Sequence, residues 1–202
     1  MEKTKRIALI ICKLLLIANL LVVLLSWIIS AMGNTDIRSL ISSEGLRWFL
    51  GNYVDIIATP VLAWLLLLAI AYSCFRQSGL SDALSKRFIG DKLMFKQRLA
   101  LRVTIIALIA IIAIVSLLVF TPHAVLLSPV GSIFPSPFSR SIIPIIAGTV
   151  TILSLLYGLV SGTINNAETA FMCLYSEIKN LFPIFIIYIL AAQLYACLRF
   201  VF

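Results

Sequence analysis

Long apolar stretches alternate with short polar segments along the whole chain. Each stretch holds 18 to 25 residues with few charges, and a helix needs about 20 such residues to cross a bilayer. Polar and apolar positions do not alternate with a period of two, and backbone groups in lipid must bond one another, so helices are predicted rather than barrel strands. The predicted spans are residues 7–31, 53–75, 103–120, 142–162 and 181–202. Residues 1–202 are therefore predicted to form one all-α membrane domain, a polytopic integral membrane helix bundle with about five transmembrane helices.

The polar segments between these spans differ in character. Residues 32–52 contain a turn followed by a short amphipathic helix. Ser43 can cap this helix, and its Trp48 is expected at headgroup depth. Residues 76–102 mix basic residues with leucine and phenylalanine, which predicts a short amphipathic helix at the membrane surface. Residues 121–140 contain four prolines, which argues against regular structure there.

The basic residues predict an orientation. Three of them precede the first apolar stretch, as in a signal peptide, but 25 apolar residues exceed the 7–15 of a signal core, so a membrane span is predicted. Of the 16 Lys and Arg residues, twelve fall in the N-terminal region, in 76–102 and between the last two spans, and four fall on the opposite side. The positive-inside rule then predicts that the N-terminus lies inside, on the cytoplasmic side, and the C-terminus outside.

The net charge of +8 suggests nucleic acid as a partner only until the spans are considered. With 62% of the residues hydrophobic, the chain is expected to lie in a lipid bilayer, where each cation near anionic headgroups contributes ~1 kcal/mol of binding. Topology and headgroup attraction account for the charge. No nucleic-acid partner is predicted.

Residues that could carry catalysis are sparse. His123 is the single histidine, and the four cysteines, at positions 12, 74, 173 and 197, never approach Cys-x-x-Cys spacing. No Gly-rich phosphate loop, nucleophile elbow or paired carboxylates are found. The sequence predicts no enzyme, no cofactor and no metal site.

Polar and small residues inside the spans are the remaining candidates for function. They either let helices approach and bond one another, or they line a pathway for a solute. Ser154, Gly158 and Gly162 share one face of the fourth span at intervals of four residues, and Gln193 lies inside the fifth span. The full set of helix-packing or pathway candidates is Thr149, Ser154, Gly158, Ser161, Gly162 and Gln193.

Two blocks of sequence resemble the aminobenzoyl-glutamate transporter (AbgT) family. The first consists of Ser43, Glu44, Gly45, Leu46, Arg47 and Trp48, then Asn52, and then Ser78, Gly79 and Leu80. The second consists of Gly131 and Ser132, Ser136 and Pro137, Ile143 and Pro144, Tyr157 and Gly158, Gly162 to Ile164, and Ala191 to Gln193, in the family's order. Together the blocks extend over about two-thirds of the chain.

The resemblance implies a reduced member of that family, located in the bacterial inner (cytoplasmic) membrane. Members of that family are dimers of chains more than twice this length. Each chain has nine spans and two re-entrant hairpins that are thought to hold sodium and substrate. The hairpins have no counterpart in these 202 residues, so the chain resembles the framework that forms the dimer.

The expected function is a scaffold or interaction subunit that forms a homodimer and binds a second membrane protein. The alternative is a small secondary transporter of aminobenzoyl-glutamate-like or other amphipathic anions, working as a dimer with a pathway between the fourth and fifth spans. An enzyme acting on lipids is disfavoured, because the acidic residues and the histidine are wrongly placed.

Overall fold

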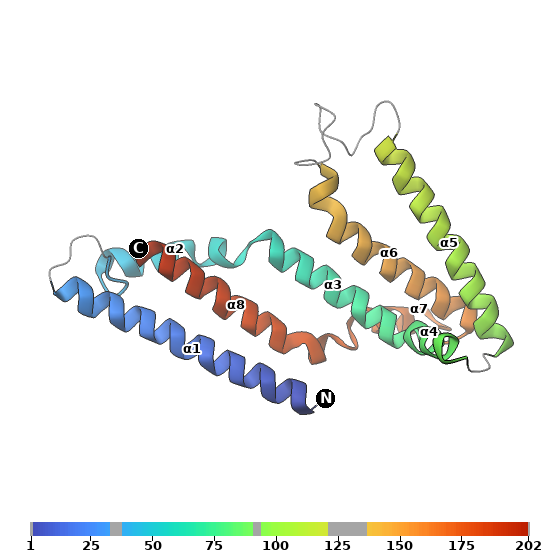
Figure 1. Ribbon diagram of the computed structural model, residues 1–202, viewed down its shortest axis with the longest axis horizontal. Coiled ribbons are helices and arrows are strands. Elements are labelled where there is room, and N and C mark those ends of the chain that lie inside the picture. Colours follow the sequence, from blue (N-terminus) through green and yellow to red (C-terminus); the bar gives the residue numbers. More distant parts are fainter. Residues whose placement is uncertain (1, 33–37, 91–93, 121–136, 202) are drawn as a thin grey trace. The chain divides into compact units, whose positions relative to one another are not determined.

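The computed structural model describes residues 2–32, 38–90, 94–120 and 137–201, and all regular structure in this part of the chain is helical. The helices, labelled in Figure 1, are α1 Glu2–Ala31, α2 Ser43–Ile57, α3 Pro60–Gln77, α4 Leu80–Ile89, α5 Phe95–Phe120, α6 Pro137–Ser161, α7 Ala167–Tyr175 and α8 Ile178–Val201. Among the described residues, five helical stretches are long and apolar enough to cross a membrane. The predicted all-α fold with five candidate spans is confirmed.

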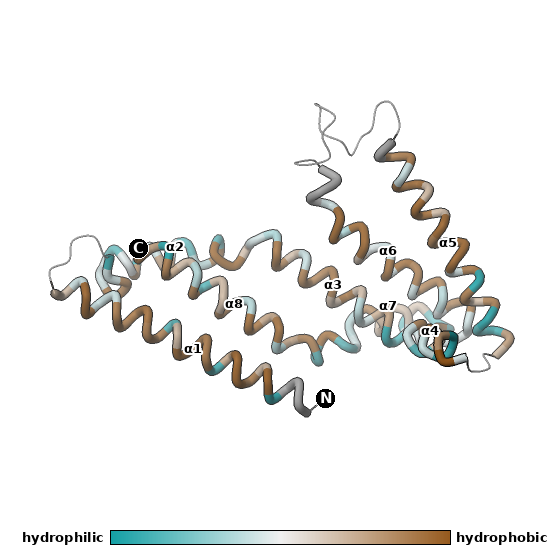
Figure 2. The backbone as a smooth tube through the Cα atoms, in the orientation of Figure 1, coloured by the Kyte–Doolittle hydropathy of each residue, from teal (hydrophilic) through white to brown (hydrophobic). Residues whose placement is uncertain are grey.

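Helices α1 and α5 show most clearly that lipid is the solvent. Both are apolar along most of their length (Figure 2), and only 6% of the residues in an 18-residue apolar window of each are buried within the protein. A helix that is apolar all round and still exposed is stable in hydrocarbon but not in water.

The chain forms two compact units, which are described one at a time. The first unit comprises residues 1–63 and 180–202. In it, the side-chain amide of Asn19 donates to the carbonyl of Leu190 at 3.1 Å. Further along both helices, Val22 of α1 lies in one cluster with Cys197 and Val201 of α8. Both contacts move toward the C-terminal end as the residue numbers rise in α1 and in α8, so the two helices run in the same direction, as Figure 1 shows. The start of α1 and the end of α8 therefore lie at opposite ends of this unit.

The second unit comprises residues 64–179. Helices α5 and α6 lie side by side and run in opposite directions (Figure 1). Near the end of α6 they meet α4 in a core of Leu80, Ala83, Ala100, Leu101 and Tyr157. Tyr157 is almost fully buried in that core, which ties α4 to the α5–α6 pair.

The predicted second span is interrupted in the structure. Helix α2 ends at Ile57 and α3 begins at Pro60. Proline has no N–H for the helix ladder and disfavours helical geometry in the residue before it, so the break falls at Ala58 and Thr59. At the start of α2, the N-cap is Ser42 rather than the predicted Ser43, because the Ser42 hydroxyl accepts a hydrogen bond from the Gly45 N–H at 3.1 Å.

Other helices also differ from the prediction. Helix α5 begins at Phe95, eight residues early, because the basic turns before the apolar stretch are helical too. Helix α6 begins at Pro137, a residue type that suits a first helical position; residues 121–136 lie outside the described part. Helix α7 was not expected, although Asn166 and Thr169 form a capping box at its start.

Candidate functional site

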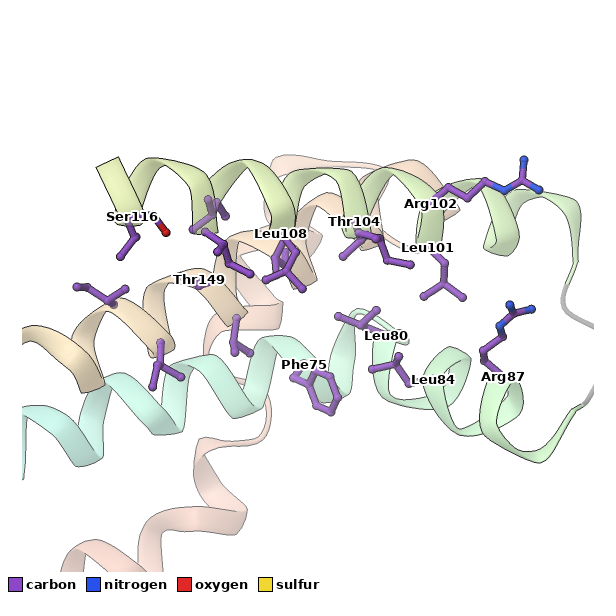
Figure 3. Close-up of a pocket in the computed structure, with 18 of the residues that line it drawn as sticks. Phe75, Leu80, Leu84, Arg87, Leu101, Arg102, Thr104, Leu108, Ser116 and Thr149 are labelled. Atoms are coloured by element: carbon purple, nitrogen blue, oxygen red, sulfur yellow. The ribbon is translucent and has the colours of Figure 1, made fainter. Parts of the chain in front are cut away.

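A pocket of about 730 Å³ lies in the second unit, between α5 and α6 on one side and the end of α3 with α4 on the other (Figure 3). Its volume lies within the 300–1,000 Å³ typical of ligand sites. The apolar part of its lining consists of Phe75, Leu80, Leu84, Leu101, Ile105, Leu108, Ile111, Ile112, Val115, Ile145, Ile146, Val150 and Leu153.

Three arginines line the same pocket: Arg87 of α4, and Arg98 and Arg102 of α5. Figure 3 shows Arg87 and Arg102 at one end of the pocket and Ser116 at the other. All three guanidinium-bearing side chains are exposed, and within the described ranges none of them has a carboxylate partner. The pocket therefore joins an apolar interior to a positively charged end.

Helical spacing explains why the arginines gather there. On α5, Arg98, Arg102 and Ile105 follow one another at intervals of four and three residues, so the arginines continue the stripe that lines the pocket. On α4, Arg87 follows Leu84 by three residues on the face that is buried at Leu80. Helix α4 itself is short because it is bounded by Gly79 (φ 79°) and Gly90 (φ 86°), in a conformation that favours glycine.

The interior of the pocket offers few polar groups. Thr104, Ser116 and Thr149 are its uncharged polar side chains. The Thr104 hydroxyl donates to the Ala100 carbonyl within α5 at 2.8 Å, so its hydrogen is already used. A ligand in this pocket would be held by apolar contact along its length and by charge at one end.

Both sequence blocks contribute to a contact beside this pocket. The Thr163 hydroxyl donates to the Ser78 carbonyl at 2.9 Å, and Gly79 lies next to the same threonine. The same hydroxyl oxygen lies 3.2 Å from the Gly158 carbonyl oxygen, and the Ile164 N–H donates to that carbonyl at 3.0 Å. Residues 85 positions apart are thus joined where α3 turns into α4 and where α6 ends.

The candidates on α6 divide between pocket and packing. Thr149 lines the pocket, and Ser154 is fully buried with no hydrogen-bond partner in the described structure. A side chain at Gly158 would meet Ile164 of the same chain. Ser161 bonds Thr163 at 3.1 Å, and Gly162, at φ 81°, ends the helix. The close approach predicted at Gly158 is therefore made within the chain, and the contribution of this face to self-association stays a prediction.

The first block lies in the first unit, at the start of α2. Glu44, Leu46 and Arg47 are exposed, whereas Gly45 is buried. An added Cβ at Gly45 would lie 2.7 Å from the Cα of Leu40 and would also meet the Ser39 carbonyl, so only glycine fits. The Trp48 ring stacks on Phe200 of α8, with 4.3 Å between ring centroids.

The interruption between α2 and α3 borders a second cavity, of about 560 Å³. The Tyr188 hydroxyl donates to the Ile57 carbonyl at 2.9 Å, so the hydrogen bond between Tyr188 and Thr59 takes its hydrogen from Thr59. These bonds replace the helix ladder at the break. The cavity is lined by Arg38, Trp48, Asn52, Asp55, Ile56, Thr59, Ala192, Tyr195, Ala196, Arg199 and Phe200.

Gln193 lies near the middle of α8 and is half-exposed. It belongs to the first unit, whereas Thr149, Ser154 and Ser161 belong to the second, so no single unit brings these four candidates together. Pro144 lies inside α6, and Pro137 is its first residue. Gly131, Ser132 and His123 lie outside the described residues. Within the described ranges, no three His, Cys, Asp or Glu side chains are grouped to hold a metal ion.

Comparison with known proteins gives one positive result. The family model of the AbgT transporter family matches residues 81–201, which is more than half of the chain. The chain belongs to the AbgT transporter family. Searches of curated proteins and of solved structures each returned no significant match.

The AbgT match covers α4 to α8, including both helices that carry the pocket arginines. It includes the second block and starts after Glu44–Trp48, so the first block rests on the resemblance alone. Sequence reasoning missed the pocket itself, because Arg87, Arg98 and Arg102 were counted only as topology signals. The interval of four between Arg98 and Arg102, in phase with the apolar stripe of α5, is the signal that identifies them.

Proposed function

We propose that this AbgT-family protein is a membrane framework subunit that assembles with a second copy of itself through α8. Membership of a transporter family supports a role connected with transport. The observation that favours assembly is Gln193, a half-exposed amide near the middle of an apolar helix, with no hydrogen-bond partner in the described part of the chain.

The physical reason is that hydrocarbon cannot bond an amide. Gln side chains in membrane helices bond across helix interfaces, and such bonds contribute about 0.6 kcal/mol on average and up to about 1.7 kcal/mol. Apolar contact adds little in lipid, because lipid tails are as apolar as leucine. A Gln193 pair between two copies of α8 would satisfy both amides at once.

The test compares the mass of the protein in lipid nanodiscs, by light scattering, for the wild type and for Gln193→Leu. We expect a wild-type dimer and a dissociation constant about 3- to 20-fold higher for the variant. Ile186→Leu is the control, because it changes an exposed residue of α8 without removing a polar group. A wild-type monomer, or a stoichiometric second protein in place of the second copy, would contradict the homodimer.

A second candidate function, transport of amphipathic anions, is favoured by the break between α2 and α3. Secondary transporters bind substrates where helices are interrupted, and here the break borders a cavity lined by Asp55 together with Arg38 and Arg199. Uptake of aminobenzoyl-glutamate into vesicles containing only the purified protein, abolished by Arg199→Gln, would support transport. Absence of uptake would leave the framework function.

We also propose that the N-terminus lies inside and the C-terminus outside the bacterial inner membrane. The basis is the excess of basic residues in the N-terminal region and in 76–102. A cysteine introduced at Ser132 should react with an impermeant reagent added to intact cells, whereas a cysteine at Ser85 should not. The opposite labelling pattern would reverse the orientation.

A further inference from the structure

We propose that the pocket of the second unit binds one phosphate-bearing, negatively charged membrane lipid, with its headgroup at the three arginines and an acyl chain along the apolar walls. This lipid is a bound component of the folded protein and is distinct from any transported solute. The proposal rests on the dimensions of the pocket, its access from the bilayer and its charge.

The dimensions match one leaflet. At 1.5 Å per residue, the 26 residues of α5 extend about 39 Å, which exceeds the ~30 Å of the hydrocarbon layer, so its basic first turns reach the headgroups. From Arg102 to Ser116 the helix advances about 21 Å. That distance covers half of the ~30 Å layer and part of the headgroup region.

The pocket opens sideways to the bilayer. Of its lining residues on α5, Ile105 remains 54% exposed, Leu108 36% and Ile112 55%. Side chains that line a pocket and are also exposed leave a lateral entrance. An acyl chain can therefore enter from the surrounding lipid without crossing a polar surface.

The charge at one end selects the headgroup. Arginine donates several N–H groups in a planar arrangement that suits phosphate oxygens. Basic pockets between membrane helices bind acidic lipid headgroups. Arg87, Arg98 and Arg102 are exposed residues of two helices, and all three line this one pocket.

The charge argues against an apolar partner helix as the occupant. Such a helix would leave Arg87, Arg98 and Arg102 without an anionic partner.

The first experiment measures lipid binding by native mass spectrometry on the full-length protein, stripped of lipid in a neutral detergent. We expect one phosphatidylglycerol per chain, bound at least tenfold more tightly than zwitterionic phosphatidylcholine. Arg98→Gln with Arg102→Gln should weaken phosphatidylglycerol binding about 25-fold, since each cation near an acidic headgroup contributes about fivefold. The matched control is Lys86→Gln with Lys96→Gln, which removes two exposed cations of the same segment that do not line the pocket and should change binding less than twofold.

The second experiment blocks the apolar walls and keeps all charges. Leu108→Trp places an indole in the pocket, whereas Ile106→Trp places it on an exposed position of the same helix outside the pocket. We expect Leu108→Trp to lose lipid binding and Ile106→Trp to retain it. This pair also decides the question if the double arginine variant does not fold.

Several results would overturn the proposal. Equal binding of phosphatidylglycerol and phosphatidylcholine would show that the pocket does not recognise the charge of the headgroup. Equal losses in the arginine and lysine double variants would show bulk attraction to the basic segment. Displacement of the lipid by millimolar inorganic phosphate would identify a site for free phosphate, and identical binding by Leu108→Trp and Ile106→Trp would place the lipid elsewhere.

Discussion

The two units of the protein hold their helices together by different means. In the first unit, polar and aromatic side chains join segments far apart in the sequence: Asn19 bonds the Leu190 carbonyl, and Trp48 stacks on Phe200. In the second unit, small residues are buried at the helix contacts and let backbones approach. These residues are Ala69, Ala71, Ala83, Ala100, Ala147 and Gly158.

The difference follows from the solvent. Lipid replaces apolar contacts at almost no cost, so a helix contact in a membrane must offer a polar bond or a close fit that lipid cannot. The first unit relies on polar bonds and ring stacking, whereas the second adds buried small residues to polar bonds such as those of Ser73 and Thr163. Where the close fit ends, between α3–α4 and α5–α6, the second unit has its pocket.

Gly45 provides the strongest test of the contrast, because it is a close-fit position inside the first unit. Gly45→Ala should destabilise the protein by about 3 kcal/mol or prevent folding, since the new Cβ meets backbone atoms of Ser39 and Leu40, which cannot move aside. Gly51→Ala, in the same helix with open space around it, should stabilise by up to about 1 kcal/mol. Thermal unfolding in detergent measures both. Similar melting temperatures would mean that Gly45 is not tightly packed.

Gly158 tests close fit in the second unit. Gly158→Ala should lower the free energy of unfolding by about 1–2 kcal/mol. The effect is smaller than at Gly45 because the new Cβ meets the flexible side chain of Ile164 rather than backbone atoms. Gly148→Ala, in the same helix with nothing within 4 Å, is the control and should not destabilise. Adding Ile164→Ala to Gly158→Ala should restore part of the loss. If it does not, Gly158 faces another chain rather than Ile164.

Ring stacking in the first unit should contribute less to the free energy of unfolding than the close fit at the two glycines. Trp48→Leu keeps an apolar side chain and removes the stack on Phe200, so about 0.5–1.5 kcal/mol should be lost. A double-mutant cycle with Phe200→Leu isolates the pair by urea unfolding. A coupling energy near zero would show that Trp48 acts only by anchoring α2 at the membrane surface.

The smallest expected effects separate the two units most clearly. Asn19→Leu removes the bond to Leu190, and Ser73→Ala removes the bonds to the Cys173 carbonyl and the Glu177 N–H. Each should cost about 0.6 kcal/mol, or about threefold in local opening. Hydrogen exchange should then rise in α8 for the first variant and in α7 for the second. A rise in both helices for either variant would show that the units open together.

The sequence predicts the spans because membrane length and apolar composition are local properties. It did not predict the break at Ala58 and Thr59, because the hydroxyl that bonds the freed carbonyl of Ile57 comes from Tyr188, 131 residues away. The predicted N-cap, Ser43, lies one position from the observed N-cap, Ser42, because the two neighbouring serines are chemically alike.

The candidate site was harder to predict. A count of charges does not distinguish Arg98 and Arg102 from Lys86 and Lys96. Only the arginines line the pocket, and this depends on which face of α5 is turned toward α4 and α6. The small residues of α6 were recognised, but the partner of Gly158 was not, because Ile164 reaches it only after the chain turns at Gly162.

The pairing of α1 with α8 has a consequence for synthesis. The second unit is continuous in sequence, so its helices can pack as soon as residue 179 has been inserted. Asn19, in contrast, finds its carbonyl 171 residues later, which at 5–20 residues per second is about 10–35 s of translation. During that interval the amide of α1 lies in the bilayer without Leu190. Helix α1 is thus made well before α8 but locked in place only when α8 arrives, and a cellular insertase that shelters polar groups would act on α1 rather than on α5.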